Sequence, residues 1–105
     1  MVQLPSKIKK IIDKYLQSLN RHNIPIKEAI LFGSYAKGNY QEWSDIDIAL
    51  VSDIFVGDRI DDKDKIRSIT LSVSSQIEVI PFSPHDFNVQ NPFVKEILKT
   101  GIKLT

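Results

Sequence analysis

The stretch Ile30–Val51 constrains the fold more than any other part of the chain, because it joins two apolar, strand-like runs through a glycine turn. The first run ends at Gly33-Ser34, and the second, after ten intervening residues, contains Asp45 and Asp47. Apolar residues alternate with the two aspartates. Since side chains along a strand alternate between its faces, Asp45 and Asp47 are predicted to project from the same face. Two carboxylates on one face repel and are costly to bury unpaired, so the pattern predicts a compensating cation.

The residue types in this stretch suit a metal ion and a phosphate. Mg²⁺ prefers oxygen ligands and commonly takes one or two carboxylates, waters and substrate phosphates. Gly33 permits a close backbone approach, and Ser34 is able to cap a following helix whose first N–H groups would bind a phosphate. A tight turn with a helix cap and no ligand is the alternative, but the nearby aspartates favour phosphate binding. Together the turn and the carboxylates predict phosphoryl or nucleotidyl transfer.

This combination resembles a known family. The Gly33-Ser34 turn and the Asp-x-Asp motif of residues 45–47 are similar to the signature of the DNA polymerase beta nucleotidyltransferase superfamily, and residues 33–38 resemble its minimal nucleotidyltransferases. The resemblance implies the fold class α/β (α+β), a small mixed β-sheet with helices packed mainly on one face. It also implies a single nucleotidyltransferase domain over residues 1–105.

The resemblance implies which residues bind metal and act in catalysis. Asp45 and Asp47 would hold two Mg²⁺ ions, with a third carboxylate from the next strand, predicted over 76–82. Glu78 is the acid suitably placed there, isolated between apolar neighbours and in need of a partner. The family usually has aspartate at this point, so the longer side chain is expected to alter the site. A solvent-facing glutamate on an edge strand is the alternative.

The implied nucleotide substrate is ATP. Gly33, Ser34 and Lys37 are the residues predicted to bind it, with Lys37 acting as a point charge where relatives often have arginine. A solvated Lys37 is the alternative. Trp43, just before the aspartates, could floor the nucleotide pocket, although packing of its loop on the core is the favoured prediction.

The composition of the 105-residue chain excludes several other chemistries. It contains no cysteine, which rules out disulfides, thiolate zinc sites and cysteine nucleophiles. The net charge of +1, from 14 basic and 13 acidic residues, gives no strong signal for nucleic-acid binding. No apolar run approaches the roughly 18 residues of a membrane helix, and the N-terminus lacks the apolar core of a signal peptide, so a cytoplasmic protein is expected.

The first half of the chain predicts alternating helices and strands. Ser6 is expected to cap a first helix that ends near residues 20–23, and a short helix is expected over 35–38. Residues 66–73 suit either a strand or a helix, and the family resemblance favours the helix. The first helix has apolar residues at helical spacing: Ile8, Ile11, Ile12, Tyr15, Leu16 and Leu19. Strands are expected over 27–32, 45–51 and 76–82.

A dense charge cluster occupies residues 52–64. It is predicted to be a solvated loop leading into a helix. A metal site there is the alternative, but the acids lack the spacing of a ligand loop. His22 and His85 stand outside any metal-ligand pattern and are interpreted as surface or capping residues.

The C-terminal part contains two possible helix starts. The run 83–86 (Ser-Pro-His-Asp) resembles a capped start, and Asn91-Pro92 repeats the device. A short amphipathic helix should then end at Gly101, and residues 102–105 could add a terminal strand.

The acceptor of the transferred nucleotide is the least constrained part of the prediction. The resemblance to antitoxins of helical HEPN-type ribonuclease toxins implies transfer of AMP to a hydroxyl on a partner protein of that type. A partner or a second subunit would complete the cleft, so a homo-oligomer is also possible. Two alternatives stay open: a binding module that occludes a partner without chemistry, and a transferase acting on a small molecule such as an aminoglycoside.

Overall fold

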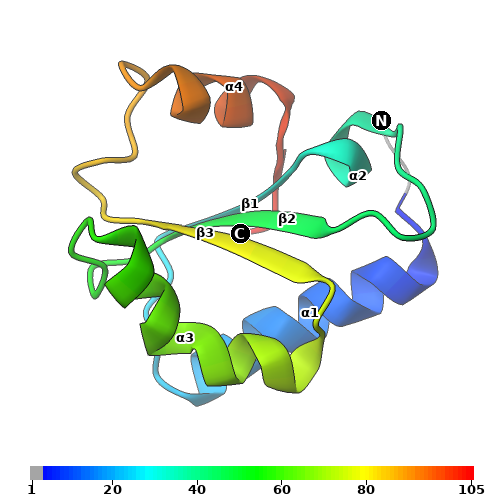
Figure 1. The fold of residues 1–105 in the computed structure, drawn as a ribbon, viewed down its shortest axis with the longest axis horizontal. Coiled ribbons are helices and arrows are strands. Elements are labelled where there is room, and N and C mark those ends of the chain that lie inside the picture. The colour runs from blue at the N-terminus through cyan, green and yellow to red at the C-terminus, as the bar shows by residue number, and fades with distance from the viewer. Residues whose placement is uncertain (1–3) are drawn as a thin grey trace.

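The computed structural model describes residues 4–105 (Figure 1). The helices are α1 (Ser6–Arg21), α2 (Ser34–Lys37), α3 (Arg59–Val73) and α4 (Pro92–Thr100). The strands are β1 (Glu28–Phe32), β2 (Ile46–Val51), β3 (Ile77–Phe82) and β4 (Ile102–Lys103). Residues 1–3 of the predicted domain lie outside the described part of the chain. Within residues 4–105, no helix combines the length and apolar character needed to cross a membrane.

One mixed sheet joins the strands in the order β3-β2-β1-β4. β1 runs antiparallel to both β2 and β4, whereas β2 and β3 are parallel. The register places Phe32 beside Asp47, and Asp47 beside Glu78. The predicted small mixed sheet of an α/β (α+β) fold is confirmed, and β1, β2 and β3 each begin one residue later than expected.

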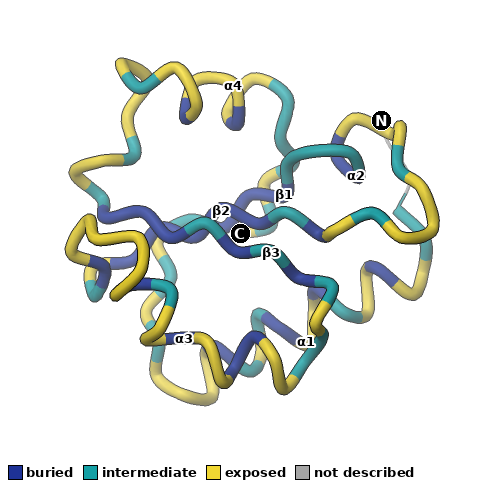
Figure 2. Tube along the Cα trace, viewed as in Figure 1, coloured by how far each residue is buried: buried dark blue, intermediate teal, exposed yellow. Residues whose placement is uncertain are grey.

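The long helices α1 and α3 pack on one face of the sheet, and α4 lies over the other (Figure 1). β2 runs between these layers and is dark blue over most of its length in Figure 2, because both of its faces are covered. The smaller core, on the α4 face, contains Ala49 and Val51 of β2. Since Asp47 continues the same alternation, it lies on the α4 face, just beyond the end of this core.

The helical interpretation of residues 66–73 is confirmed, and α3 packs against α1. The Tyr15 hydroxyl lies 2.7 Å from Thr70 Oγ1, and Thr70 Oγ1 in turn donates to the carbonyl of Ile66 at 3.0 Å. Burial raises the pKa of Tyr15 to about 12, so the phenol stays protonated and holds the two helices together as a neutral hydrogen-bonded pair.

Two predicted serine caps are wrong. α1 begins at Ser6 with Pro5 at the N-cap, and α2 begins at Ser34 with Gly33 at the N-cap; neither helix has a side-chain cap bond. In both cases the preceding residue supplies the turn, and its carbonyl accepts the first helical bond, from Lys9 to Pro5 (3.1 Å) and from Lys37 to Gly33 (3.1 Å). The serines therefore already have helical backbone angles and are one position too late to cap.

The charged segment 52–64 is not a simple solvated loop. α3 begins within it, at Arg59, and the capping residue is Asp58. The Asp58 carboxylate accepts the main-chain N–H groups of Ile60 and Asp61, both at 3.1 Å. The acids that suggest a solvated loop are thus partly helix-capping groups, which satisfy N–H groups that have no partner inside the helix.

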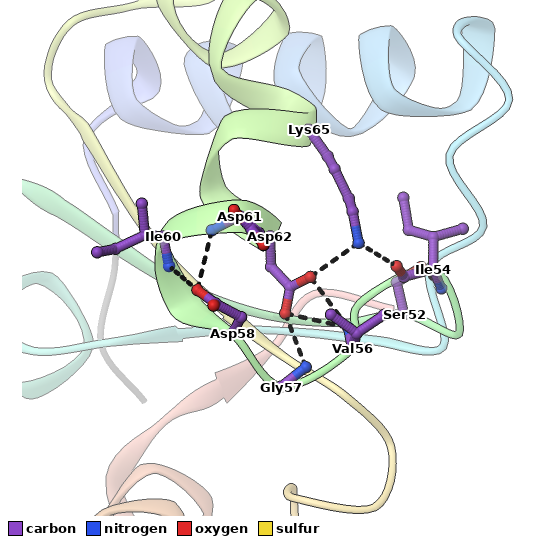
Figure 3. Close-up of polar contacts among 9 residues, drawn as sticks. All are labelled: Ser52, Ile54, Val56, Gly57, Asp58, Ile60, Asp61, Asp62 and Lys65. Carbon is purple, nitrogen blue, oxygen red and sulfur yellow. Dashed lines mark hydrogen bonds and ion pairs between the residues drawn. The ribbon is translucent and has the colours of Figure 1, made fainter.

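Asp62 in the same segment is completely buried. Its carboxylate accepts N–H groups from Val56 and Gly57, each at 2.9 Å, and the Lys65 ammonium lies 3.0 Å away (Figure 3). Lys65 also donates to the Ile54 carbonyl at 2.8 Å. The prediction of a solvated cluster is wrong here because the partners are main-chain N–H groups, which leave no trace in a charge pattern.

The C-terminal segment has one helix start, whereas the sequence predicts two. Residues 83–86 form a single turn, in which the Ser83 hydroxyl accepts the Asp86 N–H at 3.3 Å, but no helix follows. The cap at Asn91-Pro92 is confirmed: the Asn91 side chain accepts the Phe93 N–H at 2.9 Å. The terminal strand is confirmed as the short β4, paired with β1.

Candidate functional site

The end of β1 brings a glycine turn against the start of β2. Phe32 pairs with Asp47, so the next residue, Gly33, lies beside the Asp47 carboxylate. Gly33 has φ of +76°, and a Cβ atom built there would collide with Asp47 Oδ2. Both the backbone angle and the available space therefore require glycine at this position.

The parallel register of β2 and β3 places Asp47 and Glu78 on the same face of the sheet. Asp45, exposed and one residue before β2, keeps the alternation of that face. Burial raises the pKa of Asp47, and the negative charges of Asp45 and Glu78 raise it further. The predicted carboxylates are therefore close enough to repel one another, as expected of a site built to hold positive charge.

Glu78 already has a positive partner. Lys63 of α3 reaches round the edge of β3 and places its Nζ 2.8 Å from Glu78 Oε1. Both side chains are about half exposed, and both line a groove of about 490 Å³ between α3 and β3. Glu78 is thus a half-exposed residue of the edge strand β3, and its ion pair keeps one carboxylate oxygen engaged.

The donor set fits Mg²⁺ in part. Asp45 and Asp47 provide the one or two carboxylates that Mg²⁺ commonly takes beside waters and phosphates. In the part of the chain that the structure describes, no three acidic or histidine side chains are gathered closely enough to hold a metal. A third ligand from Glu78 would require its pair with Lys63 to open.

The three residues predicted to bind the nucleotide lie at the first turn of α2. Ser34 is half-buried beside Gly33, whereas Lys37 is exposed on the last position of the helix. Tyr35, between them, is buried and stacks on Tyr40 with 4.6 Å between ring centroids. The aromatic stack fixes α2, and with it the turn, against the rest of the domain.

Two residues near the aspartates differ from what the sequence predicts. Trp43 is 78% exposed, so the prediction that it packs its loop on the core is wrong. Gln76, just before β3, belongs to no sequence motif, yet its side chain donates to the Ser44 carbonyl at 2.9 Å. A glutamine preceding a strand carries no distinctive sequence signal, since its partners lie more than 30 residues away in the chain.

A family model for the nucleotidyltransferase domain matches residues 8–104. The chain belongs to this nucleotidyltransferase family. Of three similar proteins from Methanocaldococcus jannaschii, "Putative protein adenylyltransferase MJ1305" is 32% identical over 104 residues, which cover 92% of this chain and 70% of that protein. MJ0604, which carries the same description, is 48% identical over 46 residues, covering 43% of this chain and 46% of the relative. The nucleotidyltransferase described here thus matches less than half the length of MJ0604.

Solved structures share the nucleotidyltransferase fold. A toxin–antitoxin crystal structure with AMP-PNP superposes with a TM-score of 0.62 at 24% identity, over 89% of this chain and 71% of that one. The crystal structure of "a putative nucleotidyltransferase from Sulfolobus solfataricus" gives a TM-score of 0.60 at 20% identity, over 98% of this chain and 89% of that one. By family, the chain is a nucleotidyltransferase whose relatives are named as protein adenylyltransferases.

Proposed function

We propose that this nucleotidyltransferase transfers AMP from ATP to a hydroxyl group on a partner protein, in a Mg²⁺-dependent reaction. The observation that carries the proposal is the placement of Asp45, Asp47 and Glu78 on one face of the sheet, directly beside the Gly33 turn. The names of the relatives as protein adenylyltransferases support the choice of AMP and of a protein acceptor.

Each residue has a defined task in this proposal. Asp45 and Asp47 would hold the metal, which supplies positive charge to the phosphates and lowers the pKa of the attacking hydroxyl. Gly33 and Ser34 would orient the triphosphate, and Lys37 would contribute charge at its outer end. The hydroxyl oxygen forms a bond to the α-phosphorus, the bond to the β-phosphate oxygen breaks, and pyrophosphate leaves. The hydroxyl proton passes to the Glu78 carboxylate, after the ion pair between Glu78 and Lys63 has opened.

The partner proposed is a helical HEPN-type toxin, with this protein as the antitoxin. The solved neighbours support this choice, since three of them are toxin–antitoxin crystal structures, one of them with AMP-PNP. Residues 1–105 would act as one catalytic domain, and the partner would supply the remaining wall of the cleft. Because the reaction consumes ATP, we place it in the cytoplasm.

One observation favours a second function, a binding module that blocks its partner without chemistry. Glu78 is paired with Lys63 at 2.8 Å, and no three carboxylates are gathered closely enough to hold a metal within residues 4–105. A domain that only binds a partner would have no need to open this pair.

Intact-mass measurement distinguishes the two functions. The purified protein is incubated with Mg²⁺, ATP and a HEPN-type protein encoded by a neighbouring reading frame. We expect one or more AMP units on the partner, and a loss of at least about a hundredfold in rate for Asp47→Asn, since outer partners of metal ligands alone are worth up to that much. Asp53→Asn is the matched control, because Asp53 is exposed beyond the far end of β2 and should leave the rate unchanged.

A different result of the same measurement would overturn the enzymatic proposal. If no adduct forms with any nucleoside triphosphate, while wild type and Asp47→Asn bind the partner equally tightly, the protein is a binding module.

A further inference from the structure

Gln76 connects the three parts of the proposed site. It lies one residue before β3 and two residues before Glu78. Its carbonyl oxygen accepts the Ile46 N–H at 2.9 Å, which extends the parallel pairing of β2 and β3 by one step. Its side-chain amide donates to the Ser44 carbonyl at 2.9 Å and lies 3.3 Å from the Tyr35 hydroxyl.

The two partners of the Gln76 side chain, Ser44 and Tyr35, are direct neighbours of proposed site residues in the sequence. Ser44 immediately precedes Asp45, and Tyr35 immediately follows Ser34. The Ser44 carbonyl can only accept, so the NH₂ group of Gln76 must face it, and the second amide hydrogen is free to reach Tyr35. One side chain therefore links the residue before the first aspartate to the residue after the phosphate turn.

Asp45 depends on such a link because it lies outside the strand. The β2 ladder begins at Ile46, and Asp45 itself is exposed. The preceding turn closes on itself: the Gln41 N–H donates to the Ser44 hydroxyl at 2.8 Å, and the Ser44 N–H donates to the Gln41 carbonyl at 3.1 Å. The hydrogen bond from the Gln76 side chain to the Ser44 carbonyl connects this turn to the start of β3.

The opposite anchor is rigid. Tyr35 is 2% exposed and stacks on Tyr40, with 20° between the ring planes. A hydrogen bond from Gln76 to Tyr35 therefore ties the aspartate loop to an element that is itself held by packing, and the polar side chain has no unpaired donor facing the core.

We propose that Gln76 is a positioning residue, which fixes Asp45 relative to the Gly33-Ser34 turn and to Glu78. The inference rests on the proposed function, because it gives Asp45 a role as a metal ligand. Gln76 acts through the main chain of Ser44 and touches neither nucleotide nor metal.

The test uses three variants. Gln76→Met removes both side-chain bonds while keeping the length of the side chain, and Tyr35→Phe removes only the longer bond. Gln41→Met is the matched control, since Gln41 lies in the same exposed loop and joins the network through its main chain. Mn²⁺ affinity is measured by electron paramagnetic resonance, and amide hydrogen exchange is measured at residues 44–46.

We expect Gln76→Met to weaken Mn²⁺ binding about tenfold, as is typical for the loss of a group that orients a metal ligand. Exchange at residues 44–46 should become about two- to tenfold faster, as expected for a lost hydrogen bond. Tyr35→Phe should show smaller changes in the same direction, which keeps the test decisive if Gln76→Met folds poorly. Gln41→Met should behave as wild type.

Two results would overturn the proposal: unchanged exchange in Gln76→Met, or faster exchange with unchanged Mn²⁺ affinity, which would leave only a structural role. If wild type binds no Mn²⁺, the proposed function fails, and the exchange rates still decide whether Gln76 holds the Asp45 segment.

Discussion

The protein has two groups of carboxylates with opposite environments. On the α4 face of the sheet, the like charges of Asp45 and Glu78 join burial in raising the pKa of Asp47. At the start of α3, burial raises the pKa of Asp62, but the N–H groups of Val56 and Gly57 and the ammonium of Lys65 outweigh it and hold the pKa below its ordinary value (Figure 3).

The difference separates a structural carboxylate from one suited to bind a ligand. Asp62 is more deeply buried than Asp47, yet every bond it needs is supplied by the fold. Asp47 is only half-buried, but the fold sets it among negative charges and against the backbone of Gly33. Unbalanced charge, rather than burial, marks the site where an external cation is expected.

The largest effect on stability should come from Asp62→Asn. We expect it to lower the free energy of unfolding by about 3 kcal/mol, because it leaves Lys65 without its buried counter-ion and turns an amide NH₂ toward main-chain donors. Urea denaturation measures this loss. Asp47→Asn, by contrast, removes a like charge and should not lower the free energy of unfolding.

Asp61→Asn is the matched control for this comparison. Asp61 is the exposed neighbour of Asp62 in the first turn of α3, and its loss should cost only about 0.5 kcal/mol through the helix dipole. Equal losses in the two variants would contradict the assignment of Asp62 as the structural carboxylate.

Asp62 also shows where sequence interpretation stops. Periodicity and motif spacing were enough to place α1, β1, β2 and β3, because these elements are defined by which side chains face the core. The network of Asp62 depends on main-chain N–H groups at 56–57, and the turn at 83–86 is closed by the Asp86 N–H on Ser83. Neither involves a repeating pattern of side chains.

The candidate site was anticipated to a similar degree. Strand alternation predicts that Asp45 and Asp47 share a face, and the family resemblance implies Glu78 as the third carboxylate; the strand register pairs Asp47 with Glu78. The residues that tune the site were not anticipated, because Lys63 reaches Glu78 from 15 positions away, and Gln76 reaches Tyr35 from 41 positions away. Such pairs are determined by the packing of α3 and α2 on the sheet rather than by local sequence.

Asp62 and Asp47 should change the free energy of unfolding with pH in opposite directions. The lowered pKa of Asp62 means that its contribution is present above its unfolded pKa of about 3.9 and is lost as the pH falls toward the folded value. The raised pKa of Asp47 has the opposite effect: the fold gains stability as the pH falls and the carboxylate becomes protonated.

Denaturation curves from pH 7 to pH 3 measure this difference. The deficit of Asp62→Asn relative to wild type should shrink below about pH 4. Any advantage of Asp47→Asn should be present at pH 7 and disappear as the pH approaches 4. Parallel curves for both variants would contradict the contrast between the groups.

The smallest effect, and the most informative about function, should come from Lys63→Met. Its pair with Glu78 is about half exposed, so its loss should cost less than about 1 kcal/mol of stability. Since the variant removes positive charge from the carboxylate face, Mn²⁺ affinity should rise by up to about fivefold, the equivalent of that energy.

Arg67→Met, one turn further along α3, is the control. Arg67 lines the same groove as Lys63, but its ion partner, at 3.6 Å, is Asp64 of its own helix rather than Glu78, and both side chains are largely exposed. The Mn²⁺ affinity of Arg67→Met should therefore stay at the wild-type value. A fall in affinity for Lys63→Met would assign the lysine a supporting role in ligand binding. Equal Mn²⁺ affinities in Lys63→Met, Arg67→Met and wild type would indicate that Glu78 does not contribute to metal binding. Asp45 and Asp47 alone would then bind the metal.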